Sequence, residues 1–179
     1  MKTKLKAIVL FLLLSAASSI HAQTATDKAQ LKLRGRGKSL VLTTARVRRV
    51  LDVKEQIYAA RLEEVKLLFV TRKESFTYLL VDACGPSKAV ADARRCGAAD
   101  ECALLWIKLD AAWKITAIKP ARYESCWQSS SSSDGYKISG RTLRMQYDDF
   151  GEKKSYKLSY DADQPERGLQ VEESALTRL

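Results

Sequence analysis

The chain contains a single histidine among its 179 residues, His21, close to the N-terminus. Histidine is the commonest general base and the usual activator of serine and cysteine nucleophiles. If processing removes His21, the protein has no Ser-His-Asp site, no Cys-His site and no histidine-ligated zinc or copper. The four common catalytic and cofactor patterns G-x-G-x-x-G, G-x-x-x-x-G-K-[ST], H-E-x-x-H and G-x-S-x-G are also missing. We therefore expect no enzymatic activity, no cofactor and no metal.

Long apolar runs are scarce as well. No run after residue 22 approaches the roughly 18 residues that span a bilayer. Three prolines and eight glycines, with 46% apolar and 29% charged residues, are ordinary for a folded domain. The composition excludes a polytopic membrane protein, a collagen, a coiled coil and a zinc-finger array, and the length predicts one domain.

The N-terminus has the order of a secretory signal peptide. Three lysines at positions 2, 4 and 6 precede the unbroken apolar run at 7–14, and small residues follow up to Ala22. We expect cleavage after residue 22, which leaves Gln23 as the first residue. The mature protein would then be periplasmic or secreted, with no transmembrane span.

Four cysteines in a chain bound for an oxidising compartment predict two disulfides. Three pairings are possible. The favoured pairing joins Cys96 to Cys102 across a short loop and Cys84 to Cys126 between distant strands.

Short apolar runs separated by polar turns predict a mainly β chain. Three hairpins are expected, at 65–81, 103–118 and 142–160, with a last short strand at 168–171. This spacing favours an antiparallel β-sandwich. The stretch VKLLFVTRKESFTYLLVD resembles the paired strands of bacterial immunoglobulin-like extracellular modules, and the resemblance implies the same sandwich architecture.

One or two short helices are also expected. Ser87–Arg95 has an N-terminal serine, helix-forming alanines and late arginines, followed by Gly97, and predicts two helical turns. Residues 45–62 fit either a helix or a strand followed by a loop, and that choice stays open. Residues 128–135 (QSSSSSDG) predict a flexible polar connection.

The excess positive charge is confined to one segment. Eight cations and no acid lie between Lys28 and Arg49, whereas cations and acids are equal in number from Val50 onward. We expect residues 23–38 to form a basic, flexible arm ahead of one β-rich domain at 39–179. Concentrated charge of one sign attracts polyanions. The anion-binding candidates are Lys32, Arg34, Arg36, Lys38, Arg46, Arg48 and Arg49. The other interpretation is a solvated terminus leading into an edge strand that lysine and arginine protect from aggregation.

The leading functional hypothesis is an exported, non-enzymatic binding domain of the bacterial envelope, such as an inhibitor, an immunity-type protein or an accessory subunit. Its partner would be another envelope protein or an anionic envelope polymer, and not a nucleic acid, because no aromatic residue lies between Gln23 and Val50 to stack bases. Trp127 is the candidate partner contact, although packing of its ring against the neighbouring disulfide is the favoured explanation. The alternatives are a carboxylate-dependent envelope hydrolase and a polyanion-binding protein that uses the basic segment.

Overall fold

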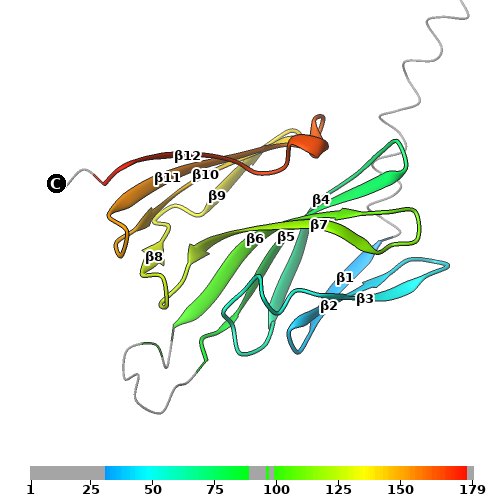
Figure 1. Ribbon diagram of the computed structural model, residues 1–179, viewed down its shortest axis with the longest axis horizontal. Coiled ribbons are helices and arrows are strands. Elements are labelled where there is room, and N and C mark those ends of the chain that lie inside the picture. The colour runs from blue at the N-terminus through cyan, green and yellow to red at the C-terminus, as the bar shows by residue number, and fades with distance from the viewer. Residues whose placement is uncertain (1–30, 89–95, 97–98, 177–179) are drawn as a thin grey trace, which may run out of the picture.

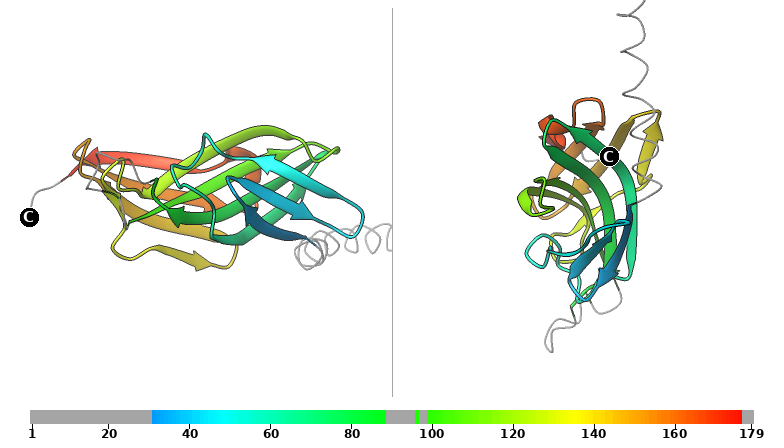
Figure 2. Two further views of the ribbon diagram at one scale, coloured as in Figure 1. Left: turned by 90° about the horizontal axis from the view of Figure 1, so that it is seen from below. Right: turned by 90° about the vertical axis from the view of Figure 1, so that its right-hand side faces the viewer.

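The computed structural model describes residues 31–88, 96 and 99–176. Three antiparallel sheets make up most of this part of the chain, and they confirm the predicted antiparallel β-sandwich class. The sheets lie as successive layers, with the four-stranded sheet in the middle (Figures 1 and 2). The three-stranded sheet has the order β1-β2-β3, the central sheet β4-β5-β6-β7, and the five-stranded sheet β12-β11-β10-β8, with β9 also paired to β10.

The strand bounds follow the chain through the three layers. The three-stranded sheet contains β1 (Lys32–Arg36), β2 (Ser39–Thr43) and β3 (Arg48–Asp52). The central sheet contains β4 (Glu64–Lys73), β5 (Phe76–Pro86), β6 (Asp100–Leu109) and β7 (Ile115–Glu124). The third sheet contains β8 (Ser130–Ser131), β9 (Tyr136–Ser139), β10 (Thr142–Asp149), β11 (Lys154–Asp161) and β12 (Gln170–Ala175).

The central sheet is buried on both faces, which explains why its two middle strands are almost continuously apolar. Along β5, Leu79 and Val81 belong to the core shared with the three-stranded sheet, whereas Leu80 belongs to the core shared with the five-stranded sheet. In β6, Leu105 belongs to the core shared with the three-stranded sheet and Trp106 to the core shared with the five-stranded sheet. Neighbouring side chains on a strand point to opposite faces, so each middle strand supplies both cores.

All three predicted hairpins are present as β4–β5, β6–β7 and β10–β11, and the predicted last strand is β12. Residues 45–62 contain strand β3 and a loop, so the helical alternative is wrong. Most of the expected helix at 87–95 lies outside the described residues. Within the described ranges, the helical element is the short 3₁₀ turn Pro165–Arg167.

Two other expectations need correction. Residues 32–36, predicted to belong to a flexible arm, form strand β1, because Leu33 packs against the core shared with the central sheet. Residues 128–135, predicted to be a flexible connection, contain β8, whose Ser130 is buried and pairs with Asp149 of β10. Gly37 and Lys38 form the turn between β1 and β2, and residues 23–30 of the predicted arm lie outside the described residues.

The number of disulfides is confirmed, but the predicted pairing is wrong. The bonds join Cys84 to Cys102 and Cys96 to Cys126. Cys84 and Cys102 lie directly opposite each other in the β5–β6 ladder, with their Cα atoms 4.1 Å apart. Cys96–Cys126 connects the segment before β6 to the segment after β7. Short sequence separation favoured Cys96–Cys102, but strand register brings other partners together.

The loop after β3 is held tightly against β5. The backbone N–H of Ala60 donates to the carbonyl of Pro86, and that of Glu63 donates to the carbonyl of Cys84. A Cβ atom at Gly85 would come within 1.8 Å of the carbonyl oxygen of Arg61. Glycine at position 85 therefore permits this close approach of two backbones.

Candidate functional site

The outward face of the five-stranded sheet carries a row of polar side chains. Leu143 and Met145 of β10 and Leu158 of β11 face the core. Because side chains alternate along a strand, the residues between them face outward. These outward residues are Arg144, Gln146 and Asp148 from β10, together with Lys157 and Ser159 from β11.

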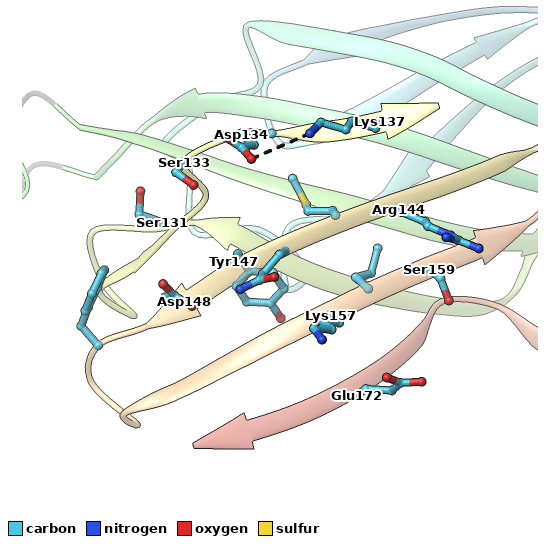
Figure 3. Close-up of a pocket in the computed structure, with 15 residues that line it drawn as sticks. Ser131, Ser133, Asp134, Lys137, Arg144, Tyr147, Asp148, Lys157, Ser159 and Glu172 are labelled. Carbon is cyan, nitrogen blue, oxygen red and sulfur yellow. Dashed lines mark ion pairs between the residues drawn. The ribbon is translucent and has the colours of Figure 1, made fainter. Parts of the chain in front are cut away.

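This face is hollowed into a groove with a volume of about 760 Å³. The segment from β8 to β9 forms one side, β12 contributes Glu172 on the other side, and the exposed ring of Phe150 lies where β10 turns into β11 (Figure 3). The volume is within the range of roughly 300–1,000 Å³ typical of small-ligand sites. The polar groups of the groove are Ser131, Ser133, Asp134, Lys137, Arg144, Gln146, Asp148, Lys157, Ser159 and Glu172.

The serine-rich segment is fixed by its own hydroxyl groups. Ser132 Oγ donates to the carbonyl of Gln146 at 2.8 Å and accepts from the backbone N–H of Gly135 at 3.1 Å. Gly135 has a positive φ of 62°, a conformation that suits glycine. Between β8 and β9, one edge of β10 is unpaired at Gln146 and Tyr147, although β11 pairs with the other edge. The serine contacts fill this gap, so the segment forms an ordered wall of the groove.

Positive charge gathers in one part of the groove. Lys137 of β9 and Arg144 of β10 are directly opposite in the strand register, and Arg144 faces Ser159 of β11 on its other side. Lys137 forms an exposed ion pair with Asp134 at 3.9 Å. In the described ranges, no acidic side chain lies within 4.0 Å of Arg144 or Lys157. Like charges opposite each other destabilise a sheet, and a bound anion would remove that repulsion.

Negative charge and hydroxyl groups occupy the other part. Asp148 faces Ser131 across the β8–β10 pair. One oxygen of this carboxylate, Oδ1, is buried and accepts no hydrogen bond from the described residues. Asp148 therefore has unused hydrogen-bonding capacity beside the groove.

The predicted anion-binding residues all lie on or beside the three-stranded sheet, but only four share one face. Lys32, Arg34 and Arg36 alternate with the core-facing Leu33, and the register places Arg48 of β3 on the same outward side. We call these four cations the basic face. Arg49 points to the opposite side, and Lys38 and Arg46 lie in the connections between strands. None of the four forms an ion pair with an acid of the described segments.

Trp127 is 42% exposed. Together with Tyr58, Lys88 and Gln128 it lines a second, smaller hollow. The guanidinium of Arg122 lies 4.4 Å from the centre of the Tyr58 ring. A role for Trp127 in partner contact stays a prediction.

A buried carboxylate, which no pattern in the sequence indicated, lies between the central and five-stranded sheets. Asp82 of β5 accepts hydrogen bonds from the hydroxyl of Tyr123, at 2.8 Å, and from that of Tyr136, at 3.2 Å. Burial raises the pKa of Asp82, and the two tyrosine hydrogen bonds oppose this rise. Tyr136 belongs to β9, so the cluster joins the two sheets.

Glu101 is the second buried carboxylate that holds distant segments together. It is 1% exposed and accepts hydrogen bonds from the hydroxyls of Ser87 and Ser125, both at 2.5 Å, and from the backbone N–H of Cys126 at 3.1 Å. Its sequence neighbour Asp100 is exposed. Because all of these hydrogen-bond donors come from the protein itself, Glu101 has a structural role.

Comparisons with protein-family models, with curated proteins and with solved structures find no match to this chain. Among the described residues, no three His, Cys, Asp or Glu side chains cluster in a way that could hold a metal ion. The same part of the chain contains no helix that is both long and apolar enough to cross a membrane.

Proposed function

We propose that the protein is an exported binding domain of the bacterial envelope that acts without catalysis and attaches to an anionic envelope polymer through the basic face. The signal-like N-terminus supports export, and two disulfides fit an oxidising compartment. The observation that carries the proposal is the convergence of four cations from two strands on one exposed sheet face.

The arrangement suits a polymer better than a small anion. Arg34 lies between Lys32 and Arg36 along β1, and successive outward residues on a strand are about 7 Å apart. Arg48 lies across the sheet beyond β2. Charges spread over such a surface match a repeated series of negative groups. Val50, 58% exposed on the same face, adds an apolar contact.

The test measures binding of the mature, oxidised protein to lipopolysaccharide and to dextran sulfate, a polyanion without carboxylates, with neutral dextran as the uncharged reference. Binding to the two polyanions should fall steeply as salt rises, because screening weakens exposed charge interactions. Each cation near an anionic surface contributes about 1 kcal/mol, so changing all four to glutamine should weaken binding by at least about a hundredfold.

The matched control removes four exposed cations elsewhere, with Lys73, Lys114, Lys153 and Arg167 changed to glutamine. Net charge is then the same in both variants. Equal losses in the two variants would show that only overall charge matters and would refute the basic face, as would binding that does not respond to salt.

A carboxylate-dependent hydrolase is the second candidate, because Asp148 and Glu172 both line the groove. Such enzymes use two carboxyl groups on either side of the scissile bond. Release of reducing ends from envelope polysaccharide, abolished by Asp148→Asn, would favour the hydrolase over the binding domain.

A further inference from the structure

We propose that the groove on the five-stranded sheet is a binding site for an acidic saccharide, a short sugar chain that carries carboxylate groups. The site is separate from the basic face: the groove lies on one outer sheet and the basic face on the other, with the central sheet between them (Figures 1 and 2). It therefore adds a second site to the binding domain and does not depend on the first.

The cationic part of the groove fits a carboxylate. Arg144 is flanked by Lys137 on β9 and by Ser159 on β11, and Lys157 lies two residues before Ser159 on the same face. Residues directly opposite in a sheet are about 5 Å apart, and outward neighbours on one strand about 7 Å apart. A carboxylate can thus accept hydrogen bonds from Arg144 and from one of the lysines at the same time. Charge-assisted hydrogen bonds of this kind are the strong ones.

The remaining groups fit the hydroxyls of a sugar. Ser131 and Ser133 can both donate and accept, Gln146 offers an amide, and Asp148 and Glu172 accept only. Asp148 already has one oxygen without a donor. A carboxylate turns easily about its last torsion, so a ligand hydroxyl can meet this capacity. Figure 3 shows Ser131, Ser133 and Asp148 on one side of the site and Glu172 of β12 on the other.

An exposed aromatic ring completes the site. Phe150 is 56% exposed and lines the groove at the β10–β11 turn. A flat apolar ring in this position offers a surface for the apolar face of a pyranose. Lys157 is directly opposite Glu172 of β12, so the cation that a neutral saccharide would leave without a counter-charge is Arg144. A simple anion would leave the hydroxyl-binding part and Phe150 unused. The acidic saccharide is the ligand class that uses every part of the groove.

The test titrates the mature, oxidised protein with trigalacturonate, with the neutral trisaccharide of galactose and with inorganic phosphate. Calorimetry should show that trigalacturonate binds at least about tenfold more tightly than either reference, because each charge-assisted contact is worth about that factor. The double variant Arg144→Gln/Lys157→Gln should lose this preference. Phe150→Ala should weaken trigalacturonate and the neutral sugar alike, because the ring contacts the apolar sugar face.

Two matched controls separate this site from the rest of the surface. Lys114→Gln/Lys153→Gln removes the same charge from exposed positions outside the groove and should leave the affinity unchanged. The variant lacking the four basic-face cations should also retain trigalacturonate binding, which distinguishes failure of this site from failure of the proposed function.

Trigalacturonate that binds no better than phosphate, or equally well to the Arg144/Lys157 variant, would overturn the proposal. All substituted side chains are exposed, and circular dichroism verifies the fold.

Discussion

Removing a single oxygen from the Asp82 cluster should destabilise the protein in a pH-dependent way. Tyr123→Phe deletes the hydroxyl that donates to Asp82 at 2.8 Å and leaves the ring, which is 8% exposed, in place. A hydrogen bond to a charged group contributes about 1.5–3 kcal/mol, so we expect a loss of about 2 kcal/mol at pH 7. With a urea m-value of about 2 kcal/mol per molar, the unfolding midpoint should fall by about 1 M.

The pH dependence has a defined sign. Burial raises the pKa of Asp82 above its unfolded value. Its contribution to stability is therefore fully present below the unfolded pKa of about 3.9 and is lost as pH rises through the folded pKa. The Tyr123 hydroxyl favours the ionised form, so deleting it raises the folded pKa of Asp82 further. Tyr123→Phe should therefore lower the free energy of unfolding by the whole of about 2 kcal/mol at neutral pH, and by less as Asp82 becomes protonated.

The matched control is Tyr156→Phe, which deletes a hydroxyl donating to Glu152 at 2.7 Å on the exposed side of the fold. Exposed interactions of this kind contribute about 0–1 kcal/mol, so this variant should unfold near the wild-type midpoint. Urea unfolding at pH 4 and pH 7, followed by tryptophan fluorescence, measures both variants. A loss in Tyr123→Phe that is the same at both pH values, or greater at pH 4, would refute the reasoning.

Two further predictions concern the elements that hold the loops together. Peptide mapping without reduction should recover Cys84 linked to Cys102 and Cys96 linked to Cys126. Replacing Cys96 and Cys126 with serine should lower the free energy of unfolding, measured by chemical denaturation, by about 3–4 kcal/mol in the chain-entropy model. Glu101→Ala leaves two serine hydroxyls and one backbone N–H without their acceptor, so it should lower the free energy of unfolding by about 3 kcal/mol or more. Asp100→Ala, at the exposed neighbouring position, should change the free energy of unfolding by less than about 0.5 kcal/mol. A small effect of Glu101→Ala would contradict its structural role.

Part of the candidate sites was visible in the sequence. The cluster of cations between Lys32 and Arg49 was identified, but its division into a shared face and scattered residues depends on the β1–β2–β3 register. The groove was missed. The hairpin β9–β10 around Gly140 was the available signal, because its two-residue turn sets Lys137 opposite Arg144.

The sequence by itself determined the features that depend on neighbouring residues. Alternating apolar runs and polar turns specify the hairpins, because side chains on a strand repeat every two residues. Four cysteines behind a signal-like segment specify two disulfides. Tertiary structure alone decided which cysteines meet, which face Arg48 occupies and how Tyr136 reaches Asp82. These outcomes depend on strand register and on the packing of one sheet against another, which bring together residues far apart in the chain.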